Sequence, residues 1–195
     1  MDLCDLTAVK SRLEIPIDVE KYDSPLSDLI RVASSEIESF LERNLTVGTY
    51  TEYFDVIDKR DIYLLKAYPV SSITSIKVST TWEWDSTTAM ASTGYKVKSS
   101  GELYVNPVYL LSGPSALQVV YVGGLATNMQ TLVANHRSLS DACVRHVCFL
   151  YNTGGKNAGA TNVTSHSGNV SYSQSAQFSG DVMAILNRYK RRRFI

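Results

Sequence analysis

The sequence predicts an α+β fold, in which a small helical bundle of about four helices carries an inserted antiparallel β-sheet between helices two and three. Apolar residues recur every three or four positions in residues 6–41, and again in residues 139–150 and 181–189, as in helices that bury one face. Between residues 49 and 122, short segments alternate apolar and polar side chains, as strands do. Since 44% of the 195 residues are hydrophobic, the chain is able to bury a sizeable core.

The first predicted helix is short and spans Leu6–Leu13, where apolar residues repeat at spacings of three and four. Asp5 or Thr7 is expected to cap its N-terminus, because their side-chain oxygens accept hydrogen bonds from the free N–H groups of a first turn. Pro16 is expected to end this helix, since proline disfavours the helical conformation in the residue before it.

The second predicted helix has the stronger pattern. Ser24 is expected to be its N-cap, and Pro25 suits the first helical position, where the missing N–H costs nothing. Asn44 is expected to stop the helix by adopting the left-handed conformation. The apolar residues that share one face are Leu26, Leu29, Ile30, Ala33, Ile37, Phe40 and Leu41.

Residues 49–122 predict the inserted sheet, because Val, Ile, Thr and Tyr become common there and alternate with polar residues. The clearest alternations are Tyr50–Phe54, Ile73–Val78, Tyr95–Val97 and Leu117–Val122. Turn-forming residues separate them at Asp58–Asp61, Tyr68-Pro69, Ser99–Gly101, Ser112–Pro114 and Gly123-Gly124. Short strands at this spacing indicate an antiparallel arrangement.

Helical periodicity returns with Ser138 or Ser140 as the cap, and the helix is expected to stop at Asn152–Gly155. A final helix is predicted from about Asp181. Its apolar face comprises Val182, Ile185, Leu186 and Tyr189. The expected organisation is therefore a core domain over residues 1–151, a polar Ser/Gly/Asn-rich loop over 152–180, and a C-terminal helix with a basic tail over 181–195.

The polar loop contains a latent strand. Apolar or larger side chains alternate with serine, glutamine and other polar residues near its end, which is a period of two. Such a segment forms a strand when it finds an edge to pair with, on a neighbouring subunit or on a partner. The residues predicted for this strand addition are Val170, Tyr172, Gln174, Ala176 and Phe178.

Charge is balanced overall but uneven along the chain. Lys plus Arg and Asp plus Glu each number 19, which excludes a globally basic nucleic-acid coat protein. Residues 1–61 carry fourteen acids and seven bases, whereas residues 62–195 carry five acids and twelve bases. Opposite charges of this kind allow copies of the chain to attract one another, or to attract a partner of either sign.

No apolar stretch is long enough to cross a bilayer, and the first residues have no basic region followed by an apolar run, so we expect no membrane association and no secretory signal. The three cysteines are an odd number without metal-ligand spacing. A disulfide scaffold is therefore not expected, and synthesis in a reducing cytoplasm is.

Common catalytic patterns are missing from the sequence, which has neither a phosphate-binding loop nor a Gly-x-Ser-x-Gly elbow. Cys143, His146 and Cys148 lie close enough on a helix to suggest a metal set or a Cys–His pair, but no second segment supplies further ligands, so core or interface residues are favoured. The acids Asp55, Asp58 and Asp61 fit a solvated turn better than a calcium loop. We expect no enzymatic activity, no cofactor and no metal.

Trp82 and Trp84 have two interpretations. Alternation places both on one face of a hairpin, where they stack on a base or sugar or, as we favour, belong to the core or a subunit contact. The basic tip, Arg188–Arg193, is also open to several interpretations. It is a helix C-terminus stabilised by the helix dipole, a phosphate-binding group, or a docking segment, and the apolar Phe194 and Ile195 that follow suit a pocket.

The order of these elements resembles the tailed-bacteriophage head–tail connector proteins, also called adaptor or head-completion proteins. The resemblance covers nearly the whole chain except the serine-rich stretch, and the chain departs from shorter relatives at Thr80–Thr93 and at residues 152–180. The segments that carry it are Leu6–Leu13, Leu26–Leu41 with Glu42-Arg43-Asn44, Tyr68–Val78, Gly101–Val105, Val119–Gly124, Leu139–Tyr151 and Asp181–Arg192.

The resemblance implies a structural virion protein in the neck of a phage particle. It implies a ring, of about twelve copies, between the portal protein and a tail or stopper protein. Such a ring extends the channel through which double-stranded DNA passes without sequence specificity. The C-terminal segment of such proteins commonly reaches the portal, and here that role falls on Arg188, Tyr189, Lys190, Arg191, Arg192, Arg193, Phe194 and Ile195. The alternative function is a small DNA-binding module that uses the same basic tip.

Overall fold

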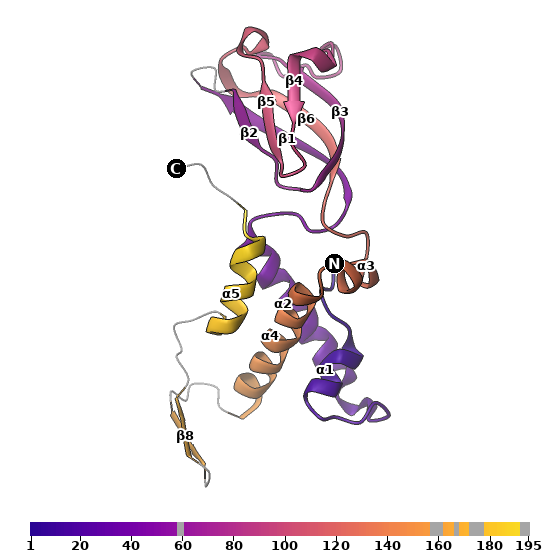
Figure 1. Cartoon of the computed structure of the whole chain (residues 1–195), viewed down its shortest axis with the longest axis vertical. Helices are drawn as coiled ribbons and strands as arrows, with labels where there is room; N and C mark the ends of the chain where they lie inside the picture. Colours follow the sequence, from indigo (N-terminus) through magenta and orange to yellow (C-terminus); the bar gives the residue numbers. More distant parts are fainter. Residues whose placement is uncertain (58–60, 157–161, 166–167, 172–177, 192–195) are drawn as a thin grey trace. The chain divides into compact units, whose positions relative to one another are not determined.

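The computed structural model describes residues 1–57, 61–156, 162–165, 168–171 and 178–191, and it confirms the predicted α+β class (Figure 1). The chain divides into two compact units. We call the first the helical unit, formed by Met1–Leu41 and Asn128–Lys190. We call the second the β unit; it comprises Glu42–Thr127, and Arg191 rejoins it after the last helix.

The helical unit is built around one helix, α4 (Arg137–Lys156), which contacts each of the other four (Figure 1). Those four are α1 (Leu6–Arg12), α2 (Asp23–Leu41), α3 (Met129–Asn135) and α5 (Gly180–Tyr189). The predicted apolar face of α2 is buried at Leu26, Ile30, Ala33, Ile37 and Leu41. Burial of that face provides the free energy that holds a helix of this length, since isolated helices are marginal in water.

The predicted helix boundaries are partly wrong. Asp5 does cap α1, and its Oδ1 accepts a hydrogen bond from the Ala8 N–H at 2.6 Å. However, α2 starts at Asp23 and not after Ser24, because a 3-10 turn, Glu20–Tyr22, leads directly into it. The left-handed residue at its end is Glu42, with φ of 54°.

Asn44 does not stop the helix. Its N–H donates to the Lys66 carbonyl at 3.1 Å, in an isolated parallel bridge between Asn44 and Ala67. This pairing places the residue in the β unit, beyond the helix end.

The helix predicted to begin near Ser138 or Ser140 also needs correction. A short helix, α3, precedes α4, and the Asn128 side chain caps it by accepting from the Thr131 N–H at 2.8 Å. The longer helix, α4, does not stop at Asn152–Gly155 but continues to Lys156. At this end the Thr153 hydroxyl donates to the Phe149 carbonyl at 2.8 Å, so the threonine bonds to the preceding turn of the helix.

The β unit contains two antiparallel sheets of three strands each, where the sequence predicted one. The first has the strand order β1-β6-β3 and the second β2-β5-β4. The first sheet consists of β1 (Gly48–Val56), β6 (Gly113–Gly123) and β3 (Val70–Val78). The second consists of β2 (Ile62–Leu64), β5 (Glu102–Val105) and β4 (Tyr95–Val97).

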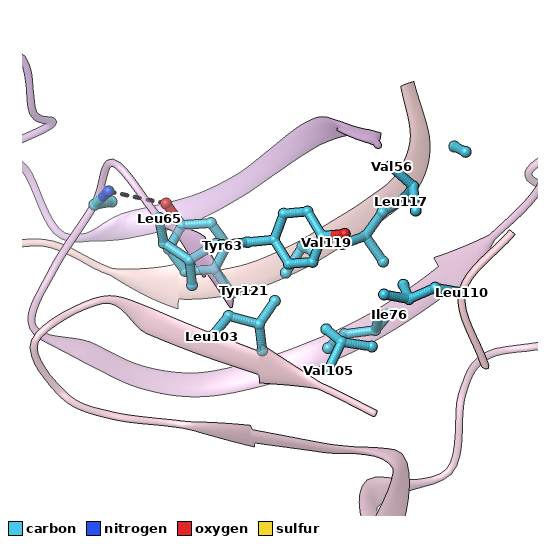
Figure 2. Close-up of a cluster of buried hydrophobic side chains, with 12 residues drawn as sticks. Val56, Tyr63, Leu65, Ile76, Leu103, Val105, Leu110, Leu117, Val119 and Tyr121 are labelled. Atoms are coloured by element: carbon cyan, nitrogen blue, oxygen red, sulfur yellow. Dashed lines mark hydrogen bonds between the residues drawn. The ribbon is translucent and has the colours of Figure 1, made fainter. Parts of the chain in front are cut away.

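Both sheets contribute to one buried cluster in the β unit (Figure 2). Tyr63 and Leu103 come from the second sheet, whereas Ile76, Val119 and Tyr121 come from the first. Figure 2 shows these five side chains pointing toward one another, together with Leu65 and Leu110 from the connecting segments. The faces that the period of two made apolar are therefore the faces that pack together.

The turn after β6 requires two glycines. A Cβ on Gly123 would lie 2.3 Å from the Ala67 carbonyl oxygen, and one on Gly124 would lie 2.3 Å from the Thr46 carbonyl oxygen. Gly124 also has φ of 133°, a conformation that other residues rarely adopt. These close approaches explain the Gly123-Gly124 pair as backbone packing where the chain leaves the sheet.

Candidate interaction sites

The start of the predicted docking segment packs on the chain itself. The Tyr189 hydroxyl lies 2.9 Å from the Ser138 hydroxyl, and its ring meets the His136 ring edge-on with centroids 5.9 Å apart. Lys190 Nζ lies 4.2 Å from the centre of the Phe40 ring, a cation–π geometry. All five residues belong to the helical unit, so the last turn of α5 is fixed by intramolecular contacts.

Arg191 is the first residue after this turn, and its guanidinium donates to the Leu64 carbonyl of the β unit. Its Nε is buried and has no hydrogen-bond partner among the described residues. Arg188 is exposed on α5. Residues 192–195, the remainder of the predicted docking segment, lie outside the described part of the chain.

An ion-pair cluster holds the N-terminal end of α5 to α4. Arg145 of α4 donates to Asp141 and to Asp181, each at 2.7 Å. The Ser179 hydroxyl donates to the other oxygen of Asp181 at 2.6 Å. The Ser179 hydrogen bond, followed by that of Arg145, lowers the pKa of Asp181 to about 2, whereas the two carboxylates raise the pKa of Arg145. The cluster therefore stays charged at neutral pH.

Part of the serine-rich loop forms a hairpin. Its strands are β7 (Asn162–Ser165) and β8 (Gly168–Ser171), and Val163 pairs with Val170. Val170 is thus in a strand whose partner in this structure belongs to the same hairpin, and its addition to another subunit or partner stays a prediction. Three further residues predicted for strand addition, Tyr172, Gln174 and Ala176, lie outside the described residues.

Phe178, the fifth residue predicted for strand addition, has a different position. It lies in a bend just before α5 and is only 2% exposed. Its ring centre is 5.3 Å from that of Phe40 and 4.6 Å from that of His146. Phe178 therefore belongs to the core of the helical unit and anchors the end of the serine-rich loop.

The two tryptophans do not form a hairpin face, which corrects the prediction. Residues 79–91 contain no strand, and Trp82 has φ of 60°, which breaks the alternation on which the prediction depended. Trp82 is exposed and donates its indole N–H to the Pro114 carbonyl at 3.1 Å. The ring of Trp84 instead packs against Tyr53, with centroids 5.6 Å apart.

Large apolar side chains are exposed at one end of the first sheet. Val56, the last residue of β1, pairs with Gly113, where β6 begins, and Trp82 bonds to the next residue, Pro114. Ile57 and Leu111 lie within two residues of this end in the sequence and Trp82 bonds to it, whereas Val108 and Tyr109 are exposed in the segment between β5 and β6. Exposed apolar groups commonly mark interaction sites. We call them the apolar rim: Ile57, Trp82, Val108, Tyr109 and Leu111. Sequence reasoning missed most of the rim, although the run Val108–Leu111 between two turns was a visible signal.

A shallow groove of about 360 Å³ lies between α1, α3 and α4. Two acids, Asp5 and Asp141, and two bases, Arg12 and Arg137, line it. Arg12 and Asp141 lie 3.9 Å apart, and both are substantially exposed. A groove with both charges suits a polar protein partner.

The cysteine and histidine cluster lies in the core, in agreement with the favoured interpretation. Cys143 and His146 are buried, whereas Cys148 is half-buried. His146 Nε2 lies 2.6 Å from Glu36 Oε2, and Cys143 Sγ lies 3.4 Å from Cys4 Sγ. Among the described residues, no three His, Cys, Asp or Glu side chains are grouped as metal ligands would be.

Of the acids near the end of β1, Asp55 uses its carboxylate in a structural contact and Asp61 its backbone carbonyl. Asp55 accepts a hydrogen bond from the Ser115 N–H at 2.6 Å, and the Asp61 carbonyl accepts one from the Val105 N–H at 2.8 Å. Asp58 lies outside the described residues. None of the described helices is both long and apolar enough to cross a bilayer.

Comparison with known proteins identifies a family and several solved chains that this chain resembles. The model of a family described as "Head completion protein" matches residues 3–192. A solved chain from the neck of an empty gene transfer agent particle, computed with C6 symmetry, has a TM-score of 0.62 at 16% identity, covering 99% of this chain and 92% of that one. No curated protein sequence matches the chain.

Two further solved chains are similar in fold. One comes from the neck of a native gene transfer agent particle computed with C12 symmetry, with a TM-score of 0.58, 16% identity and coverage of 97% and 92%. The other comes from the virion of the native gene transfer agent particle, with a TM-score of 0.57, 18% identity and coverage of 89% and 80%. The fold described above is therefore shared with chains solved in particle necks.

Proposed function

The chain belongs to the head completion protein family, and from this membership we propose that it is a structural virion protein that connects head and tail in the neck of a phage-like particle. The observation that carries the proposal is the extent of the match, which spans residues 3–192 and therefore includes both units. The shared fold with chains from gene transfer agent necks supports it. Its role on this proposal is to hold other proteins in place, without catalysis.

The working form on this proposal is a ring of twelve copies. The neck structures were computed with C12 and C6 symmetry, which supports this number because a twelvefold ring also has sixfold symmetry. A closed ring uses two different surfaces on each subunit, which meet when copies are related by rotation. On this proposal, the charged groove between α1, α3 and α4 takes part in a polar contact and the apolar rim in a separate apolar contact, each with a complementary surface of another copy or of another neck protein.

Strand addition provides a further contact between subunits on this proposal. β1 and β3 are the outer strands of their sheet, and each pairs only with β6 among the described strands. The unpaired edge of such a strand is a template for an added strand. The segment 170–176 supplies the alternating residues, whereas Phe178 stays in the core of its own subunit.

We propose that the portal protein binds the segment Arg188–Ile195. Tyr189, Lys190 and Arg191 make intramolecular contacts, so the portal contact on this proposal depends on the residues that follow them. The basic residues of this segment suit an acidic portal surface. A tail or stopper protein binds elsewhere on the ring, and double-stranded DNA passes through it without sequence-specific contacts.

Removal of the last four residues tests the portal contact. Deleting residues 192–195 leaves every described contact of α5 in place, so the melting temperature is expected to stay unchanged while co-sedimentation with a purified portal ring is lost. Arg31→Gln is the matched control, because it removes one exposed positive charge on α2. Equal portal binding by the truncated and full-length chains would contradict the proposal for this segment.

The alternative function, DNA binding through the basic tip, predicts a different dependence of affinity on salt. A chain that binds DNA through the basic tip loses affinity steeply as salt increases, by roughly one counterion for each phosphate contacted. On the connector proposal, we expect weak binding with little sequence preference. Imaging of assembled particles provides the direct test of position, and density for this chain outside the neck would contradict the connector role.

A further inference from the structure

Two buried thiols touch one another in the helical unit. Cys4 Sγ lies 3.4 Å from Cys143 Sγ, although the two residues are separated by 139 positions in the sequence. Cys4 is 1% exposed and Cys143 is fully buried, and both are free thiols. Ser34 Oγ lies 3.7 Å from Cys143 Sγ and gives that thiol a polar neighbour. The two sulfurs are thus isolated from solvent and face each other.

The two sulfur atoms need to move only a short distance to form a disulfide bond. A disulfide has its sulfurs about 2.05 Å apart, so the pair must approach by roughly 1.4 Å. Cys143 is held on α4, which the other four helices contact. Cys4 lies in the irregular segment before α1, which is attached through the Leu3 N–H to Ser34 Oγ at 3.0 Å. We expect the N-terminal segment, and not the helix, to make the adjustment.

We propose that Cys4 and Cys143 are an oxidation site, at which a low-molecular-weight disulfide such as oxidised glutathione converts the two thiols into an intramolecular disulfide. In the first step, the thiolate of one cysteine attacks the small disulfide, forms a mixed disulfide and releases one small thiol. In the second, the other cysteine attacks the protein sulfur and releases the second small thiol. The protein loses two protons and two electrons, and the oxidant becomes two thiols.

Because both thiols are buried, their oxidation depends on opening of the N-terminal segment. The hydrogen bond to Cys143, together with burial, raises the pKa of Cys4, which disfavours the reactive thiolate in the folded chain. The oxidant therefore reaches the pair only when the N-terminal segment detaches from Ser34. In a reducing compartment the thiols persist, whereas prolonged exposure to an oxidant traps the bond.

The bond would close a very long loop. It joins the N-terminal segment to α4, and the chain between them includes α1, α2 and the whole β unit. Cross-links that close long loops restrict the unfolded chain most, so the oxidised form is expected to be more stable. For a chain of this size, we expect a melting temperature higher by roughly 5–15 °C.

Cys148 provides an internal control. It lies five residues beyond Cys143 on α4, about 140° around the helix, and therefore faces another direction. Cys148 is half-buried, more accessible than either member of the pair. Accessibility alone would thus direct oxidation to Cys148, whereas the geometry directs it to Cys4 and Cys143.

The test uses the full chain incubated with oxidised glutathione, at room temperature and again in mild urea that opens the N-terminal segment. After denaturation and alkylation of remaining thiols, intact mass and peptide mapping identify the bonded cysteines. We expect one Cys4–Cys143 bond and an alkylated Cys148, reversal by dithiothreitol, and faster formation in urea. Cys148→Ser should keep the bond and the rise in melting temperature, whereas Cys4→Ser and Cys143→Ser should lose both.

Three results would overturn the inference. One is that all three thiols are alkylated under both conditions, and another is that the bond found includes Cys148. The third is a Cys4–Cys143 bond that lowers the melting temperature, which would mean that the folded chain opposes it. Because the serine variants replace sulfur with a similar small atom, their melting temperatures under reducing conditions show whether they fold.

Discussion

Phe178 packs its ring 4.6 Å from the imidazole of His146, the residue whose Nε2 lies 2.6 Å from Glu36. This contact joins three parts of the helical unit: α2, α4 and the residue pair that precedes α5. It also fixes the far end of the serine-rich loop. The loop is therefore tied to the core at both ends, by α4 on one side and by Phe178 on the other.

Phe178→Ala is expected to destabilise the helical unit. Removal of a fully buried phenylalanine leaves a cavity and typically costs about 3–5 kcal/mol. Chemical denaturation measures the loss, and hydrogen exchange should show that protection falls first in α5. Val32→Ala, which truncates an exposed apolar side chain on α2, is the control and should change stability by less than about 0.5 kcal/mol.

Tyr121→Phe tests the polar contact inside the β-unit core. The Tyr121 hydroxyl accepts from the Ala67 N–H at 2.9 Å and donates to Glu52, and burial followed by the Glu52 hydrogen bond raises its pKa. The variant leaves the buried N–H without its partner, so we expect a loss of about 1–3 kcal/mol. Tyr53→Phe, which removes a half-exposed hydroxyl, should cost clearly less. Equal losses of stability in the two variants would show that burial of the Tyr121 hydroxyl adds nothing to its contribution.

Asp181→Asn is expected to give a pH-dependent loss of stability. The pKa of Asp181 is lowered from 3.8 to about 2 in the folded chain. A lowered pKa means that the carboxylate contributes stability above about pH 4, and that the contribution disappears as the pH falls through 2. Because the group is exposed, we expect a difference of only about 0.2–1 kcal/mol at pH 7.

The comparison of variant and parent chain from pH 7 to pH 2 checks this expectation. The two stability curves should converge at the acidic end, and the difference at pH 7 should shrink in high salt. Asp18→Asn controls for the change in net charge, because Asp18 is exposed in the segment before α2 and is not one of the carboxylates that pair with Arg145. A constant difference across the pH range would contradict the role assigned to the Asp181 carboxylate.

Gly124→Ala and Gly180→Ala should act in opposite directions. The added Cβ at Gly124 meets the Thr46 carbonyl oxygen at 2.3 Å in a residue with φ of 133°, so we expect a loss of about 2 kcal/mol or more. A Cβ at Gly180 meets no atom of the described residues within 4 Å, and alanine favours the helix that starts there, so a gain of about 0.5 kcal/mol is expected. Urea denaturation of both variants measures the two effects, and a stable Gly124→Ala chain would contradict the crowding at the turn.

The amphipathic helices were predictable because their pattern is long. The face of α2 repeats over five turns, and the apolar residues of α5 recur as expected, with Val182 and Leu186 buried. The short helix α3 was missed because seven residues, of which only Leu132 is buried, give too little periodicity. The ends of helices were predicted less accurately, because local hydrogen bonds determine where a helix stops. The bond from the Asn44 N–H to the Lys66 carbonyl is an example.

Strand partners and exposure were less predictable. A period of two identifies a strand but not its neighbour, so it could not separate two sheets from one. It also placed Phe178 on a strand, although contacts with Phe40 and His146 bury it beside α5. Adjacent leucines illustrate the same limit: Leu110 is 2% exposed and Leu111 is 53% exposed. Only the fold separates the core from the apolar rim.

The chain enters and leaves the β unit through segments that pair with each other. Thr46 bridges to Ala126, and Gly48 pairs with Gly123, so both ends of the insertion are held together by its own backbone. An insertion whose ends are closed in this way can change in sequence or length between Gly48 and Gly123 while its junction keeps the same backbone pairing.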